Sequence, residues 1–345
     1  MTSRSNRVSR NAVVGSFILL FWTALPTHQS YSAESKSAEP GKKEGKVVLY
    51  TMMNAKDNDV ITRSFEKKYP GIIVEGYRAG PEALVNKVLT EARAGALRAD
   101  VIFGGGSELQ IFKKNGLLAP YVSSETKGIR EDFRDPEGYW TTVHLLEMVT
   151  AYNTNQIRPS DLPKAYEDLL KPEFKGKMMM ESFDYAWFAT MQKFWGKDKT
   201  LAFCRKLAAQ NIRFLTGHTN IANLVAAGEG SLGVNIYAYR ASTLRKDGAS
   251  INWVPLNPVV TMLESVALSG RGANPKAAEL LIDFMLSVEG QNLIKSFGRT
   301  PVKAGVEIPD EQLAKIRPYP IDIATIYRDG LESFGKEFRT IFDIK

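Results

Sequence analysis

Cysteine and histidine are scarce in this sequence. Cys204 is the only cysteine among 345 residues, and there are three histidines. A single cysteine excludes an intramolecular disulfide and any metal cluster that needs several cysteines. Apolar residues make up 44% and charged residues 24% of the chain, which is typical of a soluble globular protein and excludes a disordered, collagen-like or coiled-coil one. A chain of this length suits two domains.

Several common catalytic motifs are also absent. The sequence contains no GxSxG, HExxH, Walker or CxxC pattern. Cys204 shares the apolar side of a predicted helix with Leu201 and Leu207, which fits a buried structural thiol better than a nucleophile. We therefore expect a protein without enzymatic activity. A secreted enzyme is the alternative from another functional class.

Residues 1–33 form a predicted secretory signal peptide. They contain Arg4, Arg7 and Arg10, no acidic residue, and then fourteen uncharged residues from 12 to 25. A membrane-spanning helix needs about 20 apolar residues, so this run fits the hydrophobic region of a cleavable signal, with a membrane anchor as the alternative. No cysteine lies near the cleavage site, which excludes a lipoprotein. The mature protein is expected to be exported.

Residues 34–45 are charged and small, with almost no apolar side chain, and predict a disordered tether. Loss of the three signal-peptide arginines would lower the formal charge from +7 to +4. That excess is far below the basic balance of a nucleic-acid-binding protein, so no nucleic-acid partner is expected.

Short apolar runs alternate with amphipathic segments in the first part of the mature chain. The runs at 47–50, 72–74 and 100–103 predict buried strands, and the segments between them predict helices. A second region of the same kind follows from residue 148. This order predicts an α/β fold with open, mainly parallel sheets flanked by helices. Such sheets bind ligands beyond the carboxyl ends of their strands.

Five phrases resemble the extracellular solute-binding proteins of ABC importers, in the group that includes the ferric-ion-binding proteins. They are FEKKYPG at 65–71, TEARAG at 90–95, ADVIF at 99–103, AYNT at 151–154 and LSVEGQ at 286–291. The resemblance implies the type II periplasmic-binding-protein fold, in which two α/β lobes are joined by two crossover strands and close over a ligand by hinge motion. It also implies a periplasmic monomer that delivers a small solute to the importer's permease subunits. The surface that contacts the permease is not evident from the sequence.

The resemblance also implies lobe boundaries. The first lobe is expected to comprise residues 46–146 and 262–305. The second is expected to comprise residues 150–258 with part of 306–345, whose assignment the sequence leaves open.

The first lobe offers candidate ligand-binding residues after two predicted strands. Gly105, Gly106 and Ser107 open a predicted helix, where convergent backbone N–H groups and an N-cap hydroxyl suit a carboxylate or phosphate oxygen. A tight turn without a ligand is the alternative. Thr51 and Asn54 follow the first strand, and ordinary turn chemistry is the alternative for them.

The second lobe adds Asp184 and Tyr185 after a predicted strand, where they could accept a hydrogen bond and stack on a ligand. His218 and Thr219 stand at the start of a predicted helix, where they could face an anion. Tyr237 could hydrogen-bond an organic ligand, with Tyr239 packed beneath it.

A metal site is the alternative use of the tyrosines. The ferric-binding relatives carry two adjacent tyrosines after an asparagine, whereas here Asn235 is followed by Ile236 and then Tyr237. Tyr239 could replace the missing tyrosine if both rings lie on one face of a strand. His144 and Glu147 could complete the ligand set for Fe(III), which prefers oxygen ligands.

The identity of the solute remains open at this stage. A small organic anion ranks first and Fe(III), as transported ligand, second. No resident cofactor is expected.

Overall fold

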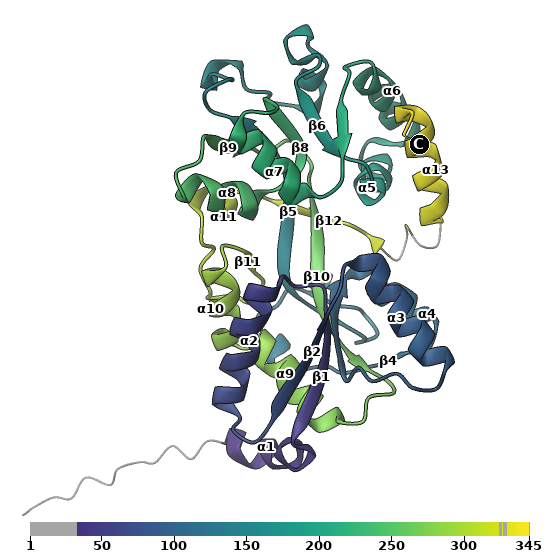
Figure 1. The fold of residues 1–345 in the computed structure, drawn as a ribbon, viewed down its shortest axis with the longest axis vertical. Coiled ribbons are helices and arrows are strands. Elements are labelled where there is room, and N and C mark those ends of the chain that lie inside the picture. Colours follow the sequence, from purple (N-terminus) through teal and green to yellow (C-terminus); the bar gives the residue numbers. More distant parts are fainter. Residues whose placement is uncertain (1–32, 324–325, 327–329, 345) are drawn as a thin grey trace, which may run out of the picture.

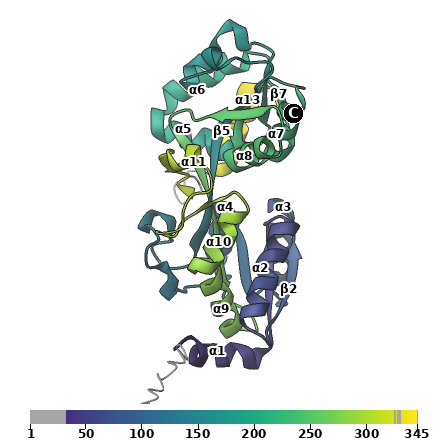
Figure 2. The ribbon, with the colours of Figure 1, turned by 90° about the vertical axis from the view of Figure 1, so that its left-hand side faces the viewer.

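The computed structural model of the protein describes residues 33–323, 326 and 330–344. The predicted signal peptide therefore lies outside the described residues, except for Ala33. Two lobes are stacked along the long axis of the molecule and meet at a narrow waist (Figures 1 and 2). No helix among the described residues is both long and apolar enough to cross a membrane.

The first lobe contains a five-stranded sheet in the order β2-β1-β3-β10-β5. Strand β1 is parallel to β2 and β3, whereas β10 is antiparallel to β3 and β5. The strands are β1 (Lys46–Thr51), β2 (Ile73–Arg78), β3 (Val101–Gly105), β5 (Thr141–Asn153) and β10 (Val259–Ser269), with short β4 (Leu118–Ala119) and β11 (Thr300–Pro301) at the margins.

Both faces of this sheet are buried, because alternate residues of β1 belong to different hydrophobic clusters. Val47 and Leu49 pack with one cluster, and Val48 and Tyr50 pack with another. The first is covered by α2 (Ala55–Lys68), α9 (Pro275–Leu286) and α10 (Val288–Ser296), and the second by α3 (Pro81–Arg93) and α4 (Gly106–Lys114). The strands of this sheet read as continuous apolar runs in the sequence because helices cover both faces of the sheet.

The second lobe repeats the arrangement with a smaller sheet. Its strands are β6 (Met178–Glu181), β7 (Arg213–Leu215), β8 (Leu232–Tyr237) and β9 (Ile251–Val254), together with the second half of β5. Helices α5 (Tyr185–Trp195), α6 (Lys197–Ala208) and α13 (Leu331–Phe342) contribute to the hydrophobic cluster on one face, and α7 (His218–Ala227) and α8 (Ala238–Lys246) to that on the other. Cys204 is fully buried in α6, in agreement with the prediction of a structural thiol.

Strands β5 and β10 connect the lobes. The first half of β5 pairs with β10, and residues from Met148 onward pair with β8 and β9 (Figure 1). Residues after 305 return to the second lobe through α11 (Glu311–Ala314), β12 (Pro318–Pro320) and α13. Five short 3-10 helices are described in the connections: Ser124–Thr126, Glu131–Phe133, Pro159–Asp161, Tyr166–Leu170 and Pro172–Phe174.

The predicted disordered tether at 34–45 is wrong. Helix α1 (Ala33–Glu44) occupies it and docks on α9. Ala38 is buried, and Gly41 approaches so closely that an added Cβ would lie 2.6 Å from Leu280. The Glu44 carboxylate accepts hydrogen bonds from the backbone N–H groups of Lys276 and Ala277 at the start of α9. Small residues allow this helix to dock although it has few apolar side chains to bury.

Candidate functional site

Polar side chains from both lobes meet beside the crossover strands. We call this set the junction cluster; it comprises Asp57, Glu108, His144, Asp184, His218, Tyr237, Tyr239, Glu264 and Arg299. All carry charged, titratable or hydrogen-bonding groups, and Asp184, His144, Glu264 and Arg299 have 6% or less of their surface exposed.

Arg299 organises the first-lobe side of the cluster. Its Nε donates to Asp57 Oδ2 at 3.1 Å, and its Nη1 lies 2.7 Å from His144 Nε2. Burial lowers the pKa of His144 well below its usual value, and the charge of Arg299 lowers it further. His144 is therefore neutral and accepts from Arg299 through Nε2. That lone pair is not available to a metal in this arrangement.

Asp184 and His218 form the opposite side of the cluster. Asp184 accepts from Asn235 Nδ2 at 3.0 Å, and its Oδ1 lies 3.4 Å from His218 Nε2. Burial raises the pKa of Asp184 well above its usual value and lowers the pKa of His218 to about 4. Both shifts favour neutral side chains for Asp184 and His218.

The two tyrosines connect these halves. Tyr237 ends β8, and its ring centroid lies 4.3 Å from that of His218 and 6.3 Å from that of Tyr239. Its hydroxyl lies 3.4 Å from Met262 Sδ on the crossover strand β10. The guanidinium carbon of Arg299 stands 4.6 Å from the centre of the Tyr239 ring, a cation–π contact between lobes.

The strand geometry expected for the tyrosines is wrong. Tyr239 lies in the first turn of α8 rather than on β8. The strand ends two residues earlier than expected, and Asn235 adopts a left-handed backbone conformation with φ 61°. The two rings nevertheless stack at an interplanar angle of 19°.

The start of α4 is occupied by the protein's own carboxylate. Hydrogen bonds from Ser107 and from the backbone of Gly105 and Glu108 stabilise the Glu108 carboxylate, although burial raises its pKa overall. A Cβ added to Gly105 would lie 2.7 Å from Glu108 Oε2 and 3.6 Å from Glu264 Oε1, so the glycine allows both carboxylates to approach. The sequence predicted Ser107 as the N-cap of α4, but the N-cap is Gly105. Gly106 faces Ile323.

Glu264 lies on β10 opposite both Gly105 of β3 and His144 of β5. Burial raises its pKa to about 7, the charge of Glu108 raises it further, and Arg299 opposes the shift. The half-buried Glu108 and the buried Glu264 thus place two carboxyl groups in one region, and Arg299, the cation that opposes the rise in the pKa of Glu264, also binds Asp57.

The N-terminus of α7 is also occupied. The backbone N–H of Gly217 donates to Glu181 Oε2, while Glu181 Oε1 is buried without a hydrogen-bond partner among the described residues. Thr219, in the first turn of α7, is exposed. The two helix starts that suggested an anion thus each contact a protein carboxylate.

Other predicted residues have structural partners or lie elsewhere. The Thr51 hydroxyl accepts from Met53 N, and the Asn54 side chain caps α2 by accepting from Asp57 N. Tyr185 packs on α13, where Arg339 donates to its hydroxyl at 2.6 Å. Glu147 is buried on the crossover strand β5, where the side chain of Thr300 lies beside its carboxyl.

Asp57, Glu108, Glu264 and Arg299 were not among the predicted site residues. Glu264 could have been noticed as the single charged residue of a mainly apolar strand. Arg299 has no local sequence signal, because its partners lie 155 and 242 positions away in the chain.

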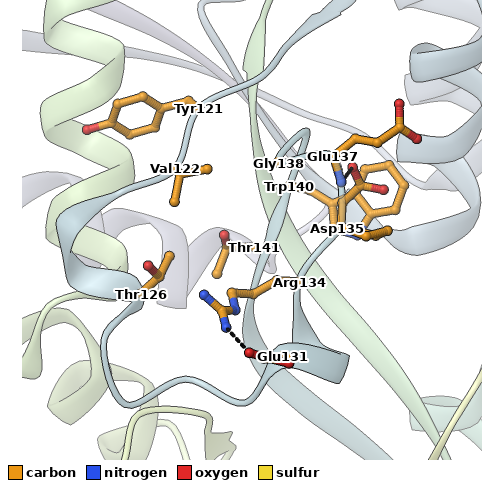
Figure 3. Close-up of a pocket in the computed structure, with 11 residues that line it drawn as sticks. Tyr121, Val122, Thr126, Glu131, Arg134, Asp135, Glu137, Gly138, Trp140 and Thr141 are labelled. Carbon is orange, nitrogen blue, oxygen red and sulfur yellow. Dashed lines mark hydrogen bonds and ion pairs between the residues drawn. The ribbon is translucent and has the colours of Figure 1, made fainter.

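The pocket shown in Figure 3 does not belong to the cluster. It has a volume of about 460 Å³ and lies in the first lobe, where Arg134 and Glu131 approach each other at 4.0 Å. No predicted site residue lines it. Among the described residues, no group of three or more His, Cys, Asp and Glu side chains is arranged to hold a metal ion.

Comparison with known proteins agrees with this architecture. The model of the family described as bacterial extracellular solute-binding protein matches residues 99–325. The chain belongs to this family. The resemblance and the solute-binding function predicted from the sequence are thereby confirmed.

A curated relative of this solute-binding protein is the Fe(3+)-binding periplasmic protein of Serratia marcescens. It is 24% identical over 290 residues, which span 80% of this chain and 82% of the relative. A probable ABC transporter periplasmic-binding protein of Sinorhizobium fredii is 29% identical over 122 residues, about a third of each chain.

Solved structures confirm the predicted two-lobe fold. Iron-bound HitA from Pseudomonas aeruginosa matches with a TM-score of 0.74 and 22% identity, over 85% of this chain and 99% of HitA. AfuA from Actinobacillus pleuropneumoniae, solved with exogenous fructose-6-phosphate, matches with a TM-score of 0.75 and 22% identity, over 88% and 100%. At this identity the likeness establishes the fold, and the ligands of those proteins do not transfer with it.

Proposed function

We propose that this solute-binding protein is the periplasmic receptor of an ABC importer, exported through the signal peptide at 1–33. It captures its solute at the junction cluster, closes, and delivers it to the permease without chemical change. The meeting of buried polar groups from both lobes beside β5 and β10 is the observation that carries this proposal. The periplasmic and transporter names of the relatives agree with it. The receptor acts as a monomer and has no nucleic-acid partner.

The junction cluster favours a solute that presents hydrogen-bond donors, as ammonium or hydroxyl groups. Glu108 and Glu264 of the cluster, and Glu181 at the start of α7, are acceptors when ionised, and burial raises the pKa of each. A donor or cation offsets that desolvation cost. The aromatic faces of Tyr237 and His218 suit a cation or a sugar ring. This ligand class replaces the organic anion as first choice, because protein carboxylates occupy both helix starts on which that choice depended.

The sign of proton exchange on binding tests the ligand class. A donor favours ionised carboxylates, so its binding releases protons near pH 7, whereas an anion favours protonated carboxyls and its binding takes protons up. Calorimetry in two buffers of different ionisation enthalpy measures this sign. Candidates come from thermal unfolding with paired compounds: glucosamine with N-acetylglucosamine, and fructose-6-phosphate with fructose. Proton uptake, or unchanged affinity in Glu264→Gln, would contradict the proposal.

Fe(III) is the second candidate, supported by the stacked tyrosines and by the iron-binding name of the Serratia relative. Against it, Arg299 occupies His144 Nε2, and burial raises the pKa of the Tyr237 hydroxyl well above its usual value. A tyrosinate–iron complex absorbs visible light. Colour after loading with ferric citrate, lost in Tyr237→Phe, would establish iron, and a colourless protein would remove it.

A further inference from the structure

A second pocket lies at the hinge, separate from the junction cluster. It has a volume of about 340 Å³ and lies between β5, β11 and the segment that leads to α11. In Figure 1 these elements lie together at the waist. Glu147, which the sequence suggested as a metal ligand, lines this pocket.

The pocket and the junction cluster lie on opposite faces of β5. Leu145 and Glu147 line the pocket, whereas His144 contacts Arg299 of the cluster. Since successive side chains of a strand point to opposite faces, one strand serves both places. No member of the junction cluster lines the hinge pocket.

Both lobes contribute apolar walls to the hinge pocket. Phe133, Leu145 and Val302 belong to a hydrophobic cluster of the first lobe. Leu313, Ile308 and Ile316 belong to a cluster of the second. An occupant would therefore contact both sides of the hinge.

Glu147 gives this apolar pocket an unmatched polar group. Only 2% of its surface is exposed, and its Oε2 has no hydrogen-bond partner among the described residues. Burial raises the pKa of the Glu147 carboxyl to about 7, and Thr300, also in the lining, lies close enough to oppose that shift, although its Oγ1 makes no well-formed hydrogen bond in the described chain. A buried acceptor without a donor carries a desolvation cost that a ligand donor can remove.

The cations in the lining do not fulfil this role. Lys303 Nζ binds the carboxylate and the backbone carbonyl of Glu125, at 2.5 and 2.8 Å. Arg130 binds Asp132 through two nitrogens. Both charges are thus already compensated by acidic residues outside the lining.

We propose that the hinge pocket is a second ligand site, for a small molecule with an ammonium group on a compact apolar body. The ammonium donates to Glu147 and to the Thr300 hydroxyl, and the apolar body packs between the two hydrophobic clusters. The proposal does not depend on the identity of the solute at the junction cluster.

Benzylammonium is the probe, and benzyl alcohol, which has the same ring and no charge, is the matched compound. Titration calorimetry of the intact protein is expected to give at least about tenfold tighter binding of benzylammonium, the size of one charge-assisted hydrogen bond. Glu147→Gln is expected to abolish this preference. Glu91→Gln, the same change at a partly buried glutamate of α3 outside both sites, is expected to retain it.

A pocket-filling variant tests the site without removing the buried charge. Val306 lines the pocket and is only partly buried, so Val306→Trp is expected to fold and to block both compounds. No saturable binding of benzylammonium to the unmodified protein would overturn the proposal. Equal binding of the two compounds, binding that survives Val306→Trp, or binding lost in Glu91→Gln and retained in Glu147→Gln would also overturn it.

Discussion

The ionised carboxylate of Glu264 is expected to lower the free energy of unfolding at neutral pH, although we propose that it binds the solute. Its pKa of about 7 in the folded protein compares with 4.5 for an ordinary glutamate. A shift of one pKa unit corresponds to about 1.4 kcal/mol, so keeping this carboxylate ionised costs about 3 kcal/mol of folding free energy. Glu264→Gln removes the titrating group and keeps the shape of the side chain.

The sign follows from linkage. Because the folded pKa is raised, the stability associated with the protonated carboxyl is fully present below pH 4.5 and is lost as the pH rises to about 7. The free energy of unfolding of Glu264→Gln minus that of the unmodified protein should therefore increase with pH over this window, by up to about 3 kcal/mol. Other titrating groups occur in both proteins and cancel in the difference to first order.

Urea unfolding at several pH values between about 4.5 and 8 measures this difference. Glu131→Gln is the control, because the Glu131 side chain is 97% exposed and its replacement should change stability little at any pH. A difference that does not vary with pH, or a Glu264→Gln protein that is less stable than the unmodified one at pH 8, would refute the reasoning.

Three other predictions concern stability. Arg299→Met leaves Asp57 without its buried cation and should lower the free energy of unfolding in urea by about 3 kcal/mol. Lys42→Met, at an exposed ion pair, should lower it by less than about 1 kcal/mol. Equal losses in the two variants would contradict the role assigned to Arg299. The pKa of His218 is lowered to about 4 in the folded protein, so the unmodified protein should lose stability as the pH falls from 6.5 to about 4. His218→Gln should remove this loss. The same dependence of the free energy of unfolding on pH in both proteins would contradict the prediction. Glu44→Ala should lower the free energy of unfolding by about 1 kcal/mol through loss of the cap on α9, and no change would indicate that α1 does not dock.

The sequence predicted those parts of the fold that depend on local pattern. Apolar runs such as 47–50 predict buried strands because strands covered on both faces have no polar side. The type II topology came from the resemblance rather than from periodicity. Helix α1 was missed because it docks through Ala38, Gly41 and the Glu44 cap, which need few apolar side chains.

The candidate site was less predictable. Asp184, His218 and Tyr237, proposed from their places at the ends of strands or the start of a helix, lie near one another in the structure. Position in the sequence could not show that Glu108 occupies the glycine-rich helix start, or that Arg299 joins Asp57 and His144. These contacts are decided by long-range packing, and no spacing in the sequence encodes them.

Small-angle X-ray scattering with a solute found by the thermal panel tests the central claim most directly. Capture between two hinged lobes predicts a smaller radius of gyration when the solute is saturating. Glu264→Gln should require more solute for the same change. Scattering curves that stay identical while calorimetry reports saturable binding would contradict a receptor that closes around its solute.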